Sequence, residues 1–157
     1  MLTLEMIQDA QKALKGIARK TPLDAAPKIG ENIYIKAENL QLTGAFKLRG
    51  AMNKALTLTP EELGRGIVAA SSGNHGKGIA YAAKLLGAKA TIVMPYTAAP
   101  VKVDAIRALG AEIVQCDVSE RFEVAERLCR ERGATMVPPF NDEDVMAGQG
   151  TAGLEIM

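Results

Sequence analysis

The feature that most constrains the fold is a regular alternation of β-rich runs and amphipathic helices that begins at Gly66. The β-rich runs are Ile67 to Ala70, Thr91 to Met94, Glu112 to Gln115 and Thr135 to Val137. A Gly-Ala pair starting at positions 87, 110 and 133 stops each helix just before the next run, as glycine does at left-handed helix ends. Because strands that alternate with helices form parallel βα units, the sequence predicts an α/β fold with an open parallel sheet flanked by helices.

The predicted helices each carry an apolar stripe that is expected to cover one face of the sheet. The stripes are Ile79, Ala82, Ala83 and Leu86, then Val101, Ala105, Ala108 and Leu109, and then Phe122, Ala125 and Cys129.

The chain before Gly66 is expected to contain helices and a strand. Residues 4–17 have apolar side chains at helical spacing, whereas residues 33–37 alternate, so Ile33 and Ile35 are expected on a buried face. Thr59-Pro60-Glu61-Glu62 is a capping pattern that predicts a further short helix.

Lys47 lies where another helix is predicted to begin and then extend to about Leu58. A lysine in a first turn is unusual, because the helix dipole places partial positive charge there. The dipole and the neighbouring Arg49 are expected to lower the pKa of the amine, which makes Lys47 a better nucleophile toward an aldehyde. The alternative is an ordinary solvated surface lysine.

Around Lys47 the sequence resembles the cofactor-lysine motif of fold-type II pyridoxal-phosphate (PLP) enzymes, specifically the threonine/serine dehydratase and serine racemase group. The matching residues are Gln41, Thr43, Gly44, Phe46, Lys47, Arg49, Gly50 and Ala51. The chain departs from the motif at Ala45, where the family commonly has serine. Residues 71–76, 94–102 and 139–151 resemble further family motifs in the same order.

The resemblance implies the N-terminal half of such an enzyme. Residues 1–65 would be an N-terminal segment of the large domain that includes the cofactor-lysine helix. Residues 66–142 would form the small α/β domain, and residues 143–157 would return to the large domain. The complete enzyme is expected to be a homo-oligomer.

The resemblance also assigns roles to individual residues. Pyridoxal 5′-phosphate would be held covalently by the catalytic Lys47, with Phe46 near its ring and Asn74 on its 3′-oxygen. The substrate carboxylate would rest on the loop formed by Ser71, Ser72, Gly73, Asn74 and His75. By spacing alone, this loop is equally well an ordinary βα turn, although such turns suit anions. A structural role is expected for the side chain of His75.

The implied activity is that of an ammonia-lyase (dehydratase), which converts L-threonine or L-serine to a 2-oxo acid and ammonia. Serine racemase is the alternative, because racemase-like members carry serine at the position of Ser72, across the cofactor from Lys47. A non-catalytic fragment that needs a complementing half is a third interpretation. In the family, the glycine-rich phosphate site lies in the later half, and these 157 residues contain no comparable run.

Gly148-Gln149-Gly150-Thr151-Ala152-Gly153 satisfies a Gly-x-Gly-x-x-Gly string, which is a weak dinucleotide signal by itself. No convincing strand precedes it, so a crossover between domains is the better interpretation. A helix is predicted to begin near Thr151.

Composition excludes several other classes of function. Nineteen basic and 18 acidic residues give a net charge of +1, without the basic block that nucleic-acid binding requires. No apolar run reaches membrane-spanning length, so a soluble cytoplasmic protein is expected. Cys116 and Cys129 lack paired-ligand spacing and His75 is the only histidine, so we expect buried free thiols and no metal site.

Overall fold

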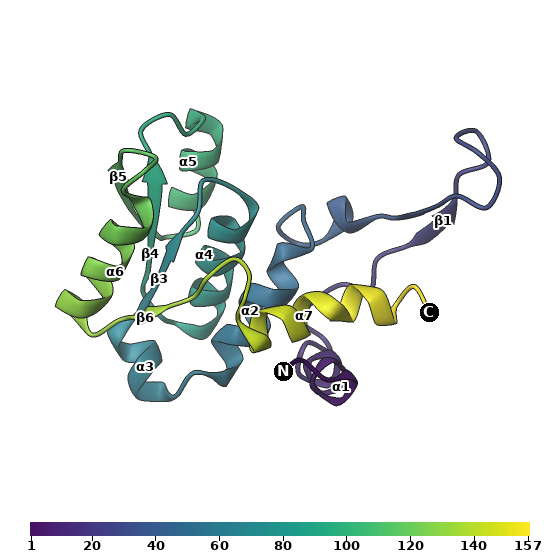
Figure 1. Ribbon diagram of the computed structural model, residues 1–157, viewed down its shortest axis with the longest axis horizontal. Coiled ribbons are helices and arrows are strands. Elements are labelled where there is room, and N and C mark those ends of the chain that lie inside the picture. Colours follow the sequence, from purple (N-terminus) through teal and green to yellow (C-terminus); the bar gives the residue numbers. More distant parts are fainter.

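The computed structural model describes residues 1–157 and contains the predicted parallel sheet (Figure 1). Its strands are β3 (Ile67–Ala70), β4 (Ala90–Pro95), β5 (Glu112–Cys116) and β6 (Thr135–Met136), in the order β5-β4-β3-β6. Val68 is in register with both Thr91 of β4 and Met136 of β6. The prediction of an open parallel α/β sheet is confirmed.

Helices cover both faces of this sheet, as Figure 1 shows. Helices α4 (Asn74–Leu86) and α5 (Pro100–Arg107) lie on one side and α6 (Arg121–Arg132) on the other. Successive strand residues point to opposite faces. Ile67 and Ala69 therefore belong to the main core beneath α4, whereas Val68 and Ala70 pack with the apolar side chains of α6.

The predicted apolar stripe of α5 is wrong, because Val101 and Ala108 are exposed, and that of α6 is wrong in its first position, Phe122. Val101 and Phe122 are 73% and 41% exposed, whereas Val103 and Ile106 in α5, and Val124 and Leu128 in α6, are buried. Val101 and Phe122 stand in the first turns of their helices, next to the open edge of the sheet. The buried face of each helix begins two residues later, at Val103 and at Val124.

The N-terminal part differs more from its prediction. Helix α1 ends at Ala13 instead of Ile17 (Leu4–Ala13), and strand β2 (Tyr34–Lys36) pairs only with the unpredicted β1 (Leu23–Ala25). These strands form an arm that extends away from the main sheet (Figure 1). Because no second layer covers the arm, Ile33 and Ile35 are 39% and 46% exposed, and the predicted buried face is wrong.

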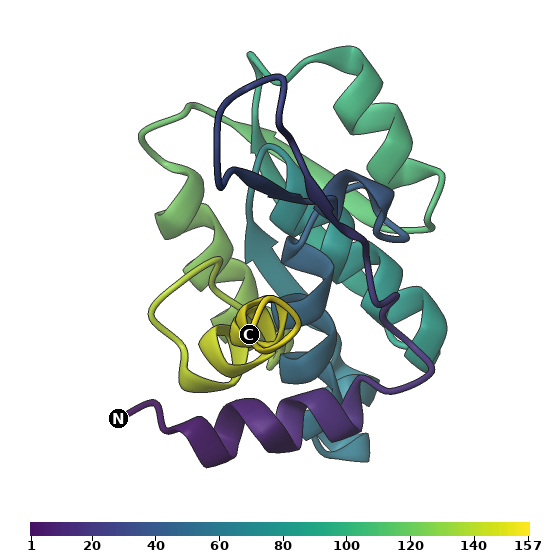
Figure 2. The ribbon, with the colours of Figure 1, turned by 90° about the vertical axis from the view of Figure 1, so that its right-hand side faces the viewer.

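Helices α2 (Lys47–Thr57) and α3 (Pro60–Arg65) follow a short 3-10 turn, η1 (Glu38–Leu40), and begin where the sequence predicts. Thr59 and Glu62 form the predicted capping box of α3. Helix α2 packs between α4 and the C-terminal helix α7 (Glu143–Leu154), and α7 also contacts α1 (Figure 2).

Helix α7 begins at Glu143, eight residues before the predicted start near Thr151. The Asp142 side chain caps it by accepting a hydrogen bond from the Val145 amide at 3.0 Å. The Gly-x-Gly-x-x-Gly string therefore lies inside a helix and is not a strand-to-helix turn. A Cβ atom at Gly148 would lie 2.5 Å from the Arg49 carbonyl oxygen, so this glycine allows α7 to cross α2 backbone to backbone.

Candidate active site

The carboxyl ends of the parallel strands meet at one edge of the sheet, where a cavity of about 300 Å³ opens. Ser71 and Ser72 line it from the end of β3, and Pro139 and Phe140 line it from the segment between β6 and α7. In open α/β sheets, ligands bind outside the carboxyl ends of the strands. This edge is therefore the candidate active site.

Lys47 is the first residue of α2, and its side chain contacts Pro139, one of the residues that line this cavity. Its Nζ donates a hydrogen bond to the Pro139 carbonyl oxygen at 2.6 Å and lies 5.4 Å from the centre of the Phe46 ring. Burial lowers the pKa of Lys47 below its ordinary value. The amine is therefore more often neutral, which is the form that attacks an aldehyde or accepts a proton.

The predicted cause of this shift is partly wrong. The pKa of Lys47 is lowered by burial of its amine, and Arg49 does not contribute to this shift. The guanidinium of Arg49 forms ion pairs with Glu38 at 2.8 Å and Glu155 at 2.7 Å, so its charge is compensated locally.

The loop after β3 is organised by Ser71. Its Oγ accepts hydrogen bonds from the amides of Gly73 at 3.3 Å and Gly76 at 3.0 Å. Ser71 thereby satisfies the Gly76 amide in the first turn of α4, whereas the N-cap residue Gly73 has no side chain to cap the helix. The amides of Asn74 and His75 have no acceptor within the protein and lie beside the positive end of the helix dipole. Such a turn is suited to bind a carboxylate.

The structure divides the predicted site residues between two cavities. Ser71 and Ser72 share the first cavity with Pro139, the partner of Lys47. Gly73 and Asn74 instead line a second cavity of about 200 Å³, together with Lys77 and Lys102. The side chains of Ser72 and Asn74 are exposed, so both are accessible to a ligand.

His75 faces inward, and the residue is only 3% exposed. Nε2 lies 2.9 Å from the Val137 carbonyl oxygen, and since only an N–H can donate to a carbonyl, Nε2 carries the proton. Nδ1 is buried without a partner. Burial, aided by the nearby charge of Lys47, lowers the pKa of His75 to about 4. A neutral, inaccessible ring supports the structural role expected for this side chain.

Arg121 also lines the first cavity and was not identified from the sequence. It is the first residue of α6, its Nη1 donates to the Val118 carbonyl oxygen at 2.5 Å, and its guanidinium lies 4.8 Å from the Phe122 ring centre. A signal was present, because Arg121, like Lys47, is a cation at the positive end of a helix dipole. The same argument applied to every predicted helix start would have found it.

The residues around Lys47 fit the reactive aldehyde end of the cofactor that the sequence resemblance implies, whereas Asn74 lines the other cavity. The chain offers a half-buried amine with a lowered pKa, an aromatic ring beside it, and accessible side chains at Ser72 and Asn74. No group of three or more His, Cys, Asp or Glu side chains is placed to hold a metal ion, and both cysteines are free. None of the helices has the length and apolar character needed to cross a membrane.

Known proteins are similar to the chain over nearly its whole length. The family model described as "Pyridoxal-phosphate dependent enzyme" matches residues 14–157. Over its whole length the chain is 48% identical to an L-threonine ammonia-lyase of Thermotoga maritima, of which it covers 41%. The chain thus spans less than half the length of this relative.

Two solved structures are similar to nearly the whole chain. A threonine deaminase from T.th. has 43% sequence identity and a TM-score of 0.91, with coverage of 98% of this chain and 50% of that protein. The serine racemase from Dictyostelium discoideum has 40% identity and a TM-score of 0.92, with coverage of 99% and 53%. Both similarities include the sheet, the Lys47 helix and α7.

Proposed function

The chain belongs to the family of pyridoxal-phosphate-dependent enzymes, and on this premise we propose that it is part of an ammonia-lyase acting on L-threonine or L-serine. The products would be a 2-oxo acid and ammonia. The similarity to an L-threonine ammonia-lyase and to a threonine deaminase supports this substrate class. The observation that carries the proposal is the position of Lys47, whose half-buried amine touches the wall of a cavity at the carboxyl edge of the sheet.

We propose that Lys47 holds the cofactor, with Phe46 beside its ring and Asn74 on its 3′-oxygen. When bound, the cofactor supplies an electron sink for the electrons left behind by a departing α-proton. The free amides of Asn74 and His75 would bind the substrate carboxylate. Nζ of Lys47, once free, would take the α-proton, and its lowered pKa favours the neutral amine that this step needs.

Departure of the α-proton would be followed by loss of the β-hydroxyl group of the substrate. Hydrolysis of the resulting enamine releases ammonia and leaves the 2-oxo acid. No second base is needed on the opposite face for this reaction.

Serine racemisation is the second candidate activity, supported by the similarity to a serine racemase and by the exposed side chain of Ser72. Racemisation needs one group to remove the α-proton and another to return it from the opposite face. Ser72 would be the second group, and its hydroxyl would need activation, because it is a weak acid at its ordinary pKa.

The first test locates the cofactor lysine. The chain is incubated with pyridoxal phosphate, reduced with borohydride and mapped by peptide mass spectrometry. The label is expected on Lys47 and lost in Lys47→Ala. A label on Lys36, Lys54 or Lys77 instead would show that the assignment is wrong.

The second test separates the two activities in the complete enzyme. Release of 2-oxo acid and formation of D-serine from L-serine are followed in parallel for the parent and for Ser72→Ala. The proposed role of Ser72 requires that D-serine formation falls while 2-oxo acid release continues. Unchanged D-serine formation would exclude that role.

Three further expectations from the sequence stay predictions: domain boundaries after residues 65 and 142, a cytoplasmic location, and homo-oligomeric assembly of the complete enzyme. The third interpretation, a fragment that needs a complementing half, requires that the 157-residue chain alone releases no 2-oxo acid from either substrate.

A further inference from the structure

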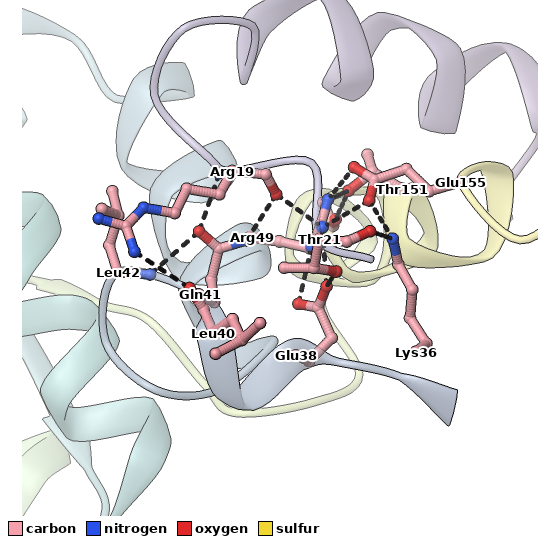
Figure 3. A network of polar contacts seen from close by, with 11 residues as sticks. Arg19, Thr21, Lys36, Glu38, Leu40, Gln41, Leu42, Arg49, Thr151 and Glu155 are labelled. Carbon is pink, nitrogen blue, oxygen red and sulfur yellow. Dashed lines mark hydrogen bonds and ion pairs between the residues drawn. The ribbon is translucent and has the colours of Figure 1, made fainter. Parts of the chain in front are cut away.

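A buried cluster of four charged side chains lies beside the first turn of α2. We call Arg49, Glu38, Glu155 and Lys36 the Arg49 cluster (Figure 3). Arg49 is 1% exposed although it carries a full charge. Its Nε and Nη2 donate to the Glu38 carboxylate at 2.9 and 2.8 Å, and its Nη1 and Nη2 donate to the Glu155 carboxylate at 2.7 and 2.9 Å.

Two further contacts bring the hydrogen bonds of the guanidinium to six, so its five N–H donors are all used and Nη2 shares one N–H between two acceptors. Nη2 also donates to the Arg19 carbonyl oxygen at 3.1 Å, and Nη1 donates to Thr151 Oγ1 at 3.2 Å. Lys36 Nζ contacts Glu155 at 2.5 Å and so balances the charges of the cluster. Burial by itself lowers the pKa of Arg49, but the bonds to both carboxylates outweigh it and raise the pKa.

These partners come from segments that are far apart in the sequence. Arg19 lies in the loop after α1, Glu38 in η1, and Thr151 and Glu155 at the end of α7. Figure 3 shows the loop, η1 and α7 converging on the guanidinium. Arg49 therefore connects the beginning of α2 to three separate parts of the chain.

Lys47 precedes Arg49 by two residues, in the same helical turn. On the other side of this turn, Gly50 meets α7, because a Cβ atom there would lie 2.6 Å from the Val145 carbonyl oxygen. The first turn of α2 is thus held by the Arg49 cluster and by a close helix crossing. The amine of Lys47 itself has a single hydrogen bond, to Pro139.

A contribution to folding stability alone is a poor explanation for the Arg49 cluster. Replacing a buried ion-pair cluster by well-packed apolar residues is often neutral or stabilising, so such a cluster is weak evidence for stability alone. What the planar, bidentate guanidinium adds is a defined geometry, which a lysine or an apolar side chain cannot reproduce.

We propose that Arg49 is a positioning residue, which fixes the first turn of α2 through Glu38, Glu155 and Thr151 and thereby sets the place of the Lys47 amine. This inference rests on the proposed function only in that Lys47 is taken as the reactive amine. Small misplacements of a reacting group reduce rates strongly, so the effect on Lys47 chemistry is expected to be large.

The test compares Arg49→Lys with the parent in the full 157-residue chain. Trace acetylation over a range of pH, read by peptide mass spectrometry, reports the amine pKa of each lysine. Borohydride trapping with pyridoxal phosphate reports the rate of capture at Lys47. Leu128→Ala, in the separate core beneath α6, is the control for general destabilisation, which urea unfolding measures for each variant.

In Arg49→Lys the pKa of Lys47 is expected to rise toward its ordinary value, because the loosened turn exposes the amine. The capture rate at Lys47 is expected to fall by about 10- to 100-fold, while Lys54 and Lys77 keep their acetylation profiles. The proposal is overturned if Arg49→Lys leaves Lys47 unchanged, or if Leu128→Ala changes Lys47 as much.

Thr151 provides a milder pair of variants if Arg49→Lys does not fold. Thr151→Val removes the hydroxyl that accepts from Arg49, and Thr151→Ser keeps it. A lower capture rate in Thr151→Val than in Thr151→Ser supports the proposal, and equal rates overturn it. Failure of the proposed function is distinguishable, because the parent would then show no label on Lys47, while the acetylation comparison would still decide the role of Arg49.

Discussion

Two arginine–glutamate clusters in this protein have similar chemistry but opposite environments. Arg49 pairs with Glu38 and Glu155, and these three side chains are 2%, 14% and 11% exposed. Arg132 pairs with Glu112 and also donates to Thr91, but the arginine and glutamate side chains are 41% and 49% exposed. The first cluster joins the ends of the chain at α2, whereas the second joins α6 to the neighbouring strands β4 and β5.

Burial, more than the number of hydrogen bonds, determines how much each cluster contributes to stability. At the surface, water and salt replace a lost partner at little cost, so an ion pair contributes about 0–1 kcal/mol. In the interior, the remaining charges cannot be hydrated when a partner is lost. The Arg49 cluster is therefore expected to tolerate few changes, whereas the Arg132 cluster is expected to tolerate many.

Removing the central charge should give the largest effect. Arg49→Met leaves Glu38 and Glu155 buried with only Lys36 to compensate them, and we expect a loss of about 3–5 kcal/mol in the free energy of unfolding. Urea unfolding measures it. Adding Glu38→Gln and Glu155→Gln to Arg49→Met should recover part of the loss, because neutral amides need no counter-charge. If Arg49→Met alone loses less than about 1 kcal/mol, the value typical of an exposed pair, the contrast between the clusters is wrong.

The helix crossing beside Arg49 should be nearly as sensitive. A Cβ at Gly148 would meet backbone atoms of α2, at 2.5 Å from the Arg49 carbonyl oxygen and 2.8 Å from the Gly50 Cα. We expect Gly148→Ala to lower the free energy of unfolding by about 3 kcal/mol, since backbone cannot move aside easily. Gly153→Ala in the same helix meets no atom within 4 Å and serves as the control. It should be neutral or stabilising.

The buried His75 ring should make the stability of the protein depend on pH. Its pKa is lowered from 6.5 to about 4 in the folded protein. Between these values the unfolded chain binds a proton that the folded chain does not, so stability falls as the pH decreases through this window. We expect a loss of about 2 kcal/mol from about pH 7.5 to about pH 5. The carboxylates with lowered pKa, Glu38 and Glu155, lose their contribution only at lower pH.

The control for this prediction is His75→Gln, whose amide can still donate to the Val137 carbonyl oxygen but does not titrate. Urea unfolding at several pH values should show a flat profile for this variant between about pH 7.5 and about pH 5. An equal slope in the parent and in His75→Gln would mean that another group is responsible.

Removing the exposed arginine should give the smallest effect. Arg132→Met breaks the pair with Glu112, and we expect a change of about 0–1 kcal/mol in the free energy of unfolding. About 1 M salt should weaken the parent pair and reduce this small difference further, because exposed charges are screened. A loss as large as that of Arg49→Met would contradict the role assigned to burial.

Much of the fold was predictable because its signals are local. The alternation of strands and helices, the capping box at Thr59 and the start of α2 at Lys47 depend on residues within a few positions of each other. Left-handed glycines at Gly87 and Gly133 end their helices as predicted. The loop at Ser71 was found in the same way, as small residues between a strand and a helix.

The errors occur where the neighbours of a residue in space come from distant parts of the chain. Alternation in residues 33–37 correctly predicted a strand, but nothing local indicated that no second layer would cover it. Arg121 has no local signal beyond its place at a helix start. The glycine at Gly148 could not be explained by a helix crossing until its neighbour, the backbone of α2, was known.

The βα units, the helix that begins at Lys47 and the resemblance that assigns Lys47 its role can all be read from the amino-acid sequence. The lowered pKa of Lys47, the pairing of Arg49 with Glu38 and Glu155, and the neutral His75 ring arise from the three-dimensional fold. Helical periodicity and capping arise from contacts within one or two turns, so a short window of sequence contains them. Desolvation and ion pairing depend on groups brought together by the fold, and Glu155 lies 106 residues from Arg49.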